Sequence, residues 1–341
     1  MRNFFSINCL FLLLFGCKNE VDMIKCKGLD GEPKYLYFKT ENEGYLFSNK
    51  TYSDWDNVTD EQMKDPNFYP ESTDEANIYK TIDGGKNWVK IDSILNYNYF
   101  DIATVFNNAV YILRSDERED FKFNIEHFDV ETEEVKNLLN TKPVVSAIWN
   151  NENKIFFTNN RGSIKLYSLD KNQGLDSIGI ENYALQGLSI NNKSYAIFSS
   201  SETSYFGSVD KENKEIKLPI IPSCITKQDN NILIAGKTKT DNNEISLVSY
   251  NVNTKQSKTI KKFKGYSIVD YLQSNDKAII GFIGNIKGFF VEYDLIYSLD
   301  KGNTWKIRTL DESNYVRPSC LIDNILYIYS GGARMQKIII K

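Results

Sequence analysis

The chain of 341 residues has 41 basic and 45 acidic side chains, which gives a formal net charge of −4. Hydrophobic residues make up 41% and charged residues 25%, a composition that excludes disorder as the state of the whole chain. The mild acidity argues against a nucleic-acid partner, which selects a basic surface. His127 is the single histidine, so most Ser-His, Cys-His and His-zinc chemistry is excluded as well.

The first sixteen residues have the pattern of a secretory signal peptide. Arg2 precedes a short apolar run at 9–15, well below the roughly 18–20 residues that span a membrane. The run ends in Leu14-Phe15-Gly16-Cys17, which resembles a bacterial lipobox. The resemblance implies cleavage before Cys17 and acylation there, and thus an extracytoplasmic protein anchored by lipid to the cell membrane or the outer membrane. The alternative is an ordinary signal peptide with an incidental cysteine.

Three cysteines remain in the body of the chain, namely Cys26, Cys224 and Cys320. An odd number permits at most one internal disulfide, and the spacing is irregular. We therefore expect a fold that does not depend on disulfides, with at least two of the three as buried free thiols.

A polar turn followed by an apolar strand occurs seven times along the chain. Except for the longer first interval, the turns lie about 40–50 residues apart. The strands after these turns are expected at 45–47, 109–113, 155–157, 194–198, 232–235, 278–282 and 325–329.

Other apolar segments supply further strands in most repeats. They are expected before the turns at 101–106, 144–149, 267–272 and 315–322, after them at 123–129, 164–169 and 245–251, and in fourth place at 215–218 and 258–263. Four short antiparallel strands at this period are typical of a β-propeller blade. The sequence therefore predicts an all-β protein, a seven-bladed β-propeller that forms a single domain over residues 17–341.

The last repeat has only three strands and ends at 338–341. Residues Val21–Lys27 precede the first repeat and have no unit of their own. Because a ring must close and an unpaired strand edge invites aggregation, we predict that Val21–Lys27 supplies the missing fourth strand. The alternative is that 18–28 is only a flexible tether.

Two turns share the pattern Ser/Thr-x-Asp-x-Gly-x-x-Trp, at 81–88 and 298–305. The pattern resembles the Asp box of sialidases, sortilin-type receptors and the photosystem II assembly factor family, and 35–48 with 78–91 is most similar to the last of these. The resemblance implies a structural role at the rim, away from the binding face. An aspartate can accept turn N–H groups, a glycine permits unusual backbone angles and a tryptophan can cover the hairpin. The residues concerned are Asp83, Gly85, Trp88, Asp300, Gly302 and Trp305.

No catalytic constellation emerges from the sequence. A sialidase would require an arginine triad and an early Arg-Ile-Pro motif, yet no arginine lies between residues 3 and 113. Other glycosidases need only two carboxylates about 5–10 Å apart, and no spacing among the 45 acidic residues singles out a pair. Residues 54–61 loosely resemble a calcium loop but lack its central glycine and its terminal glutamate. We assign no metal and no cofactor.

The first interval between turns, from Asn42 to Asn107, is about twenty residues longer than the others. The excess falls at 49–76 and includes Tyr52, Trp55, Phe68 and Tyr69. Long insertions in a rigid scaffold are often functional, so these aromatic residues form the candidate binding loop. The alternative is that they pin the loop to its own blade.

These observations together predict a lipid-anchored, non-enzymatic binding or scaffold protein for a protein or glycan partner. One alternative is a carbohydrate-active enzyme that uses an unrecognised carboxylate pair. Another is an envelope immunity lipoprotein that neutralises a toxin.

Overall fold

The computed structural model describes residues 21–341, apart from 67, 71, 117–121, 142–144, 152, 160–164, 171–174, 180–181, 200–202, 210–214 and 311–317. The expected signal peptide and Cys17 lie outside the described residues. The same holds for parts of the expected strands at 144–149, 164–169 and 315–322.

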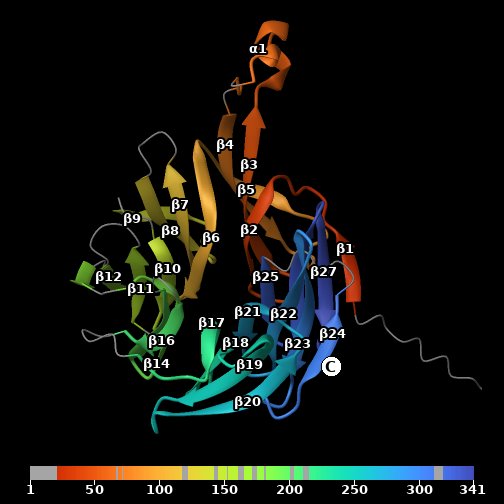
Figure 1. Cartoon of the computed structure of the whole chain (residues 1–341). Helices are drawn as coiled ribbons and strands as arrows, with labels where there is room; N and C mark the ends of the chain where they lie inside the picture. The colour runs from red at the N-terminus through yellow and green to blue at the C-terminus, as the bar shows by residue number, and fades with distance from the viewer. Residues whose placement is uncertain are drawn as a thin grey trace, which may run out of the picture.

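Seven antiparallel sheets form a ring, with the first strand of each repeat innermost (Figure 1). The predicted seven-bladed propeller is therefore confirmed. Blade 1 contains β2 (Glu32–Phe38), β3 (Gly44–Ser53), β4 (Ser72–Thr81) and β5 (Val89–Leu95). Blade 2 contains β6 (Tyr97–Phe106), β7 (Ala109–Asp116), β8 (Lys122–Asp129) and β9 (Val135–Thr141).

The remaining blades follow in chain order. Blade 3 contains β10 (Val145–Asn150), β11 (Lys154–Asn159), β12 (Lys165–Asp170) and β13 (Leu175–Gly179). Blade 4 contains β14 (Ala184–Ile190), β15 (Lys193–Ser199) and β16 (Ser204–Ser208). Blade 5 contains β17 (Ile220–Gln228), β18 (Asn231–Thr238), β19 (Asp241–Asn251) and β20 (Gln256–Lys264). Blade 6 contains β21 (Ile268–Ser274), β22 (Ile279–Lys287), β23 (Phe290–Ser298) and β24 (Lys306–Thr309).

Blade 7 closes the ring with strands from both ends of the described chain. It contains β25 (Ser319–Ile322), β26 (Ile325–Gly331), β27 (Arg334–Ile339) and the N-terminal β1 (Val21–Lys25). β1 pairs antiparallel with β27, from Val21 opposite Ile338 to Lys25 opposite Arg334. The predicted closure is confirmed, and the chain continues through a bridge between Lys27 and Asn87 into blade 1.

Blade 4 departs from the prediction, because 215–218 does not form a fourth strand. Among the described residues, only Glu215 bridges to Gly207 of β16. Leu218 is instead buried with Ile220 in the apolar cluster between blades 4 and 5. The chain therefore turns inward at this point, since burying these two side chains takes it away from the outer edge of the sheet.

Seven apolar clusters form the core, one at each junction between neighbouring blades. A blade is thus covered on both faces, which explains why its middle strands are continuously apolar rather than alternating. In β22, all residues from Ile279 to Gly284 are buried. At the closing junction, the rings of Phe38 and Tyr327 stack with their centroids 4.0 Å apart.

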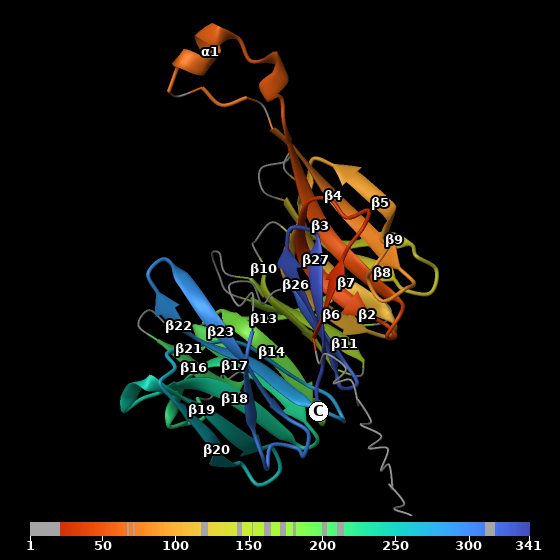
Figure 2. The same cartoon turned by 90° about the vertical axis from the view of Figure 1, so that its right-hand side faces the viewer.

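The propeller has two distinct faces. We call one the turn face, because it carries the turns that join the first two strands of each blade and also the turns at 82–88 and 299–305. The Gly84 N–H, which donates to the Asn42 carbonyl over 2.9 Å, joins two of these turns. The other is the projection face, which carries the turns between the second and third strands. Its largest feature is the end of the β3–β4 hairpin, which extends beyond the ring (Figures 1 and 2).

Candidate functional site

A channel of about 900 Å³ runs through the middle of the ring. Residues of the innermost strands of all seven blades line it. At the turn face it opens beside a second hollow of about 450 Å³, which includes Lys227 and Ser274 in its wall. Concave sites of this size hold small ligands in many proteins, so the channel is a candidate site whose chemistry depends on its lining.

A repeated irregularity shapes this channel. The pairing of the first two strands shifts register near the start of the innermost strand in six blades. Such β-bulges leave one residue unpaired and redirect its side chain. The extra residues Lys34, Leu185, Ser223 and Asp270 line the channel, and so does Ile102 from the longer irregularity of blade 2.

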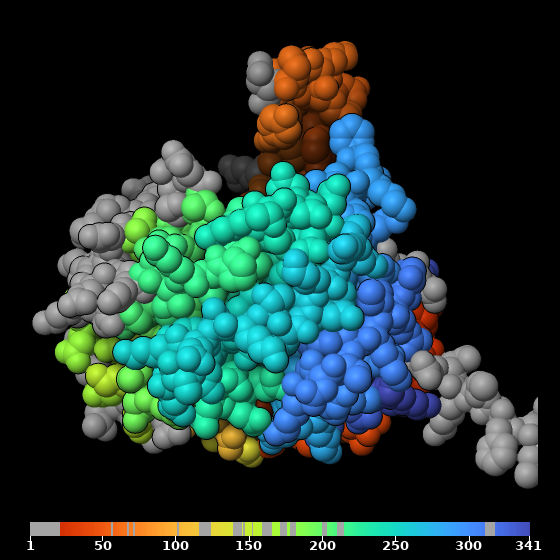
Figure 3. All heavy atoms as spheres, turned by 60° about the horizontal axis from the view of Figure 1, so that its bottom comes forward, coloured from red at the N-terminus to blue at the C-terminus, as the bar shows by residue number. Residues whose placement is uncertain are grey.

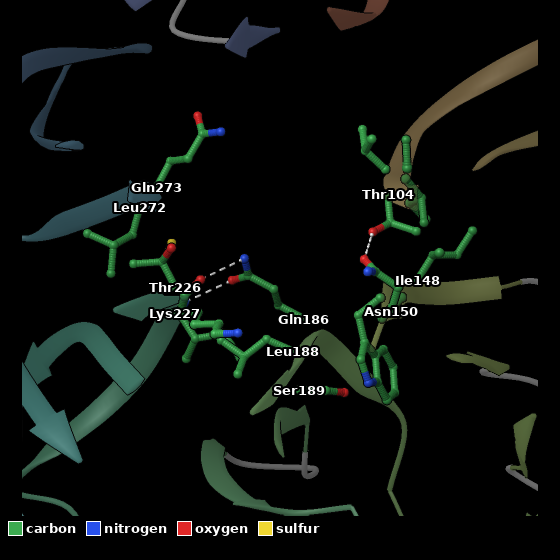
Figure 4. Close-up of a pocket in the computed structure, with 18 of the residues that line it drawn as sticks. Thr104, Ile148, Asn150, Gln186, Leu188, Ser189, Thr226, Lys227, Leu272 and Gln273 are labelled. Carbon is green, nitrogen blue, oxygen red and sulfur yellow. Dashed lines mark hydrogen bonds between the residues drawn. The ribbon is translucent and has the colours of Figure 1, made fainter. Parts of the chain in front are cut away.

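Polar side chains of the channel join neighbouring blades. The Gln186 amide donates to the Ile225 carbonyl over 3.1 Å and accepts from the Ile225 N–H over 3.0 Å (Figure 4). Thr104 donates to the Asn150 side chain over 2.7 Å, and the Leu321 N–H donates to Gln273 over 3.1 Å. These groups therefore already have partners within the protein, and their bonds fix the angle between blades.

The channel carries few charged groups. Among the described lining residues these are Lys34, Lys227 and Asp270. A pair of carboxylates for glycoside hydrolysis is therefore not found in the described part of the lining, where Asp270 is the single acid. In the described chain as a whole, no group of three or more His, Cys, Asp or Glu side chains is placed to hold a metal ion. No helix in that part of the chain is both long and apolar enough to cross a membrane.

The two Asp-box-like segments form the same local structure. Asp83 accepts from the N–H groups of Lys86 and Asn87 over 3.1 and 3.0 Å. Asp300 accepts from the Thr304 N–H and the Ser298 hydroxyl, each over 2.8 Å.

Each segment also folds its indole onto its own turn. Trp88 Nε1 donates to the Gly85 carbonyl over 2.8 Å, and Trp305 Nε1 donates to the Gly302 carbonyl over 2.9 Å. Both glycines have positive φ values, of 90° and 86°. Hydrogen bonds from Thr304 lower the pKa of Asp300 to about 2. All these contacts are internal to the turn.

The insertion expected at 49–76 is shorter than predicted. Asn49 to Ser53 continue β3 and pair with Ala76 to Ser72 of β4, so both ends of the interval belong to the blade. Asn49 also has a structural role there, because its amide donates to the Tyr99 carbonyl over 2.8 Å and accepts from the Tyr99 N–H over 2.7 Å. Only 54–71 lies outside the sheet, and we call this segment the projection.

The projection has a defined local structure. A short 3₁₀ turn (Trp55–Asn57) precedes the helix α1 (Asp60–Lys64), which buries none of its residues. Thr59 and Gln62 form a reciprocal capping box at the start of the helix. The Asp54 carboxylate accepts from the Asn57 amide over 2.8 Å. These bonds give the projection its local structure.

The four aromatic residues predicted as a binding loop all lie on the projection or at its base. Trp55 is 57% exposed and Tyr69 is 79% exposed, and Tyr52 is also exposed. Phe68 is partly buried. The exposed rings of Trp55 and Tyr69 do not pin the projection to its blade. The projection stands clear of the body, as Figure 3 shows.

A buried carboxylate anchors the base of the projection. Burial opposes the ionisation of Glu75, but hydrogen bonds from Ser93, Tyr52 and Asn77 outweigh it and lower the pKa of Glu75 to about 2. The Tyr52 hydroxyl donates to Glu75 over 2.6 Å, and the Lys50 ammonium lies 4.5 Å from the centre of the Tyr52 ring. Tyr52 is therefore tied to the blade, whereas Trp55 and Tyr69 are presented to solvent.

A second apolar tip rises from the projection face. β22 and β23 are joined by a tight turn at Gly288 and Phe289, and Lys287 is paired with Phe290. The Phe289 side chain is fully exposed, while Ile286 and Phe290 are 66% and 62% exposed. Exposed apolar side chains that gather in this way mark interaction sites. This tip could not be predicted from the sequence, because a two-residue turn adds no extra length to the repeat.

One buried ion pair was also missed. Arg114 of β7 pairs with Glu126 of β8, and both side chains are buried. Burial raises the pKa of Glu126 to about 7, although Arg114 and the Tyr99 hydroxyl act against that rise. The guanidinium also lies 4.0 Å from the centre of the Tyr97 ring. The pair joins the second and third strands of blade 2, where only the register brings these residues together.

The three cysteines of the described chain are free and buried. Burial raises the pKa of Cys26 and of Cys320 to about 11. Thiols in such surroundings stay protonated at neutral pH and are poor nucleophiles. They contribute to the apolar packing between blades.

Comparison with known proteins shows the fold and nothing finer. No protein-family model matches the chain, and no curated protein sequence matches it. The β-propeller domain of the Trilobed protease from Pyrococcus furiosus superimposes with a TM-score of 0.59 at 13% identity, covering 90% of this chain and 95% of that one. That domain is described as having an open velcro topology, whereas here β1 closes the last blade.

Two enzymes are similar at the same level. An oligogalacturonate lyase in complex with manganese has a TM-score of 0.59 at 11% identity, covering 92% of this chain and 98% of that one. An acylaminoacyl peptidase has a TM-score of 0.57 at 10% identity, covering 89% of this chain but only 52% of its own length. At these identities the likeness establishes a shared β-propeller architecture, and activities do not follow from it.

Proposed function

We propose that this propeller is a non-enzymatic binding protein, anchored by lipid at Cys17, that holds a protein partner on its projection face. The observation that carries the proposal is the projection itself, a folded element that presents the side chains of Trp55 and Tyr69 to solvent. Rigid scaffolds commonly present binding residues on such loops. Exposed tryptophan and tyrosine are the side chains that most often dominate protein interfaces.

The size of the exposed apolar area favours a protein as the partner. A large side chain has a surface of roughly 200 Å², so the exposed fractions of Trp55, Tyr69 and the neighbouring Met63 offer about 400 Å². The β22–β23 tip offers a similar area. Together they reach the ~800 Å² that each partner contributes to a stable interface.

The position of the N-terminal strand fits an anchored role. β1 starts at Val21, which pairs with Ile338 near the C-terminal end of β27. This end of β27 lies at the turn face, so the chain enters the propeller there. Cys17 lies four residues before Val21, so the chain between them spans at most about 14 Å. A lipid on Cys17 would therefore keep the turn face nearer the bilayer and direct the projection away from it.

The enzymatic alternative lacks a comparable observation. The channel polar groups bond to neighbouring blades, and its described lining holds one carboxylate. The described wall of the adjoining hollow has two, Asp229 and Asp276, and Asp229 is already paired with Lys301. A binding function needs no such constellation.

The test replaces 54–71 by Asn-Gly, which joins Ser53 directly to Ser72 through a two-residue turn. Capture of proteins from the native envelope is then compared for the wild type and this variant. A control variant, I82S/L299S, removes exposed apolar side chains of the turn face. We expect the shortened variant to keep its folded circular dichroism spectrum and lose a partner that the control retains. Unchanged capture by the shortened variant, or capture of glycan alone, would overturn the proposal.

A further inference from the structure

The negative charge of the chain is concentrated on the projection. Residues 54–71 contain six acidic residues and one lysine, which gives a net charge of −5, whereas the whole chain carries −4. All other residues together therefore sum to +1. The surplus of acid that distinguishes this protein is found on one 18-residue segment.

The acidic side chains surround the apolar ones. Asp54, Asp60, Glu61 and Asp65 are exposed, and they flank Trp55 and Met63 along the chain. Among the described residues, Asp60 and Glu61 form no ion pair that would neutralise them. A partner must therefore accept aromatic side chains and negative charge on the same small area.

We infer that the surface docking on the projection is a cationic protein surface, with lysines and arginines around an apolar recess that accepts Trp55 and Tyr69. The inference rests on the proposed binding function and specifies its partner. It follows from charge complementarity, since a neutral or acidic surface would leave four exposed carboxylates desolvated or repelled at the contact. The shape of the projection adds to this, because a narrow, protruding tip enters a recess rather than covering a flat face.

Electrostatic attraction and apolar contact affect different rate constants of binding. Attraction between the tip and a basic surface speeds association and weakens with salt, because the Debye length falls from about 30 Å at 0.01 M to about 10 Å at 0.1 M. The buried aromatic side chains govern dissociation. Variants that remove charge and variants that remove rings should therefore change different rate constants.

The charge variant is D54N/D60N/E61Q/D65N, which keeps the shape of the side chains and removes four negative charges. Its matched control is E41Q/D229N/D276N/D323N, which removes the same charge from turns on the turn face. Both change the net charge of the whole protein equally, so a general charge effect would appear in both. The ring variant is W55A/Y69A. The far-UV circular dichroism spectrum of each variant checks that the propeller is folded.

The probe is a random cyclic-peptide phage library panned on the immobilised full chain, with peptides kept only if they lose binding to the ring variant. We expect the selected peptides to be rich in lysine and arginine together with apolar residues. Their association should slow about tenfold or more with the charge variant, and by less than about twofold with the control. Raising NaCl from 10 to 200 mM should reduce the wild-type association rate by a similar factor.

Selected peptides without a basic bias, or equal slowing by the charge variant and its control, would overturn the inference. These outcomes are independent of envelope capture. If an envelope protein is lost on removing 54–71 but the peptides are not basic, the binding function stands and the cationic partner is wrong. If the peptides are basic but no envelope protein depends on the projection, the proposed function is wrong.

Discussion

The two Asp-box-like segments are almost identical in local structure but differ in what their tryptophans contact. Trp88 is 4% exposed and lies in the cluster that joins blades 7 and 1, against Ile24 of the closing strand. Its backbone N–H donates to the Lys27 carbonyl over 2.9 Å. Trp305 is only partly buried and its ring meets Phe263, with the centroids 6.0 Å apart. We therefore predict that the first segment also secures ring closure, whereas the second stabilises the junction between blades 5 and 6.

The test compares the stability of the W88A and W305A variants with that of the wild type. Truncating a fully buried tryptophan costs about 3–5 kcal/mol, and we expect W88A to fall in this range. W305A should cost about half as much, because less of the ring leaves the core. Guanidinium denaturation followed by far-UV circular dichroism measures both values. In addition, W88A should lower the hydrogen-exchange protection of the amides at 21–27 about tenfold, and W305A should leave them unchanged.

Equal destabilisation by the two variants would refute this reasoning, as would unchanged protection of 21–27 in W88A. D83A and D300A provide a second comparison at the other end of each motif, where both aspartates make similar turn contacts. The two variants should therefore lower the guanidinium midpoint by similar amounts.

Two further predictions concern buried titratable groups. Because the pKa of Glu126 rises from 4.5 to about 7 on folding, the folded state binds more protons between these values, and its contribution to the unfolding free energy is lost as pH rises through 7. E126Q should remove this loss, which amounts to at most about 3 kcal/mol. The pKa of His127 is lowered and acts in the opposite direction, but this histidine is present in both proteins. Identical dependence of the unfolding free energy on pH in the two proteins would contradict this prediction. The thiols of Cys26, Cys224 and Cys320 should resist Ellman's reagent in a folded variant of residues 18–341, which lacks Cys9 and Cys17, and all three should react in guanidinium. Rapid reaction of the folded protein would show that the blade junctions are open.

The repeat, the blade count and the ring closure could be predicted because they depend on local patterns. Each innermost strand ends in a polar turn and is followed by a fully buried strand, so the period is visible without any knowledge of contacts. The closing strand was found by counting, since the last repeat lacked one strand and Val21–Lys27 had none to pair with. In each case the order of polar and apolar residues along the chain was enough for the prediction.

The channel bulges could not be predicted in this way. Lys34, Leu185, Ser223 and Asp270 occupy equivalent places but share no chemical property, because the bulge is a property of the pairing between strands. The Arg114–Glu126 pair depends on register in the same way.

The bounds of the projection were predicted too wide for a different reason. Thr51 to Ser53 and Ser72 to Asp74 form a ladder outside the core, so neither side of it is apolar and the segment has the composition of a loop. Strand prediction from alternation requires one buried face, and this extension has none. Trp55, Phe68 and Tyr69 lie on the segment that leaves the blade, whereas Tyr52 lies in β3 at its base.

The central claim is that a protein partner contacts the projection in the native envelope. Site-specific photo-crosslinking tests it directly, with p-benzoylphenylalanine in place of Trp55 on the projection or in place of Ile82 on the turn face; both positions are well exposed. The account predicts one predominant crosslinked protein from position 55 that is absent from position 82. No crosslinked protein at position 55, or the same set of proteins at both positions, would contradict it.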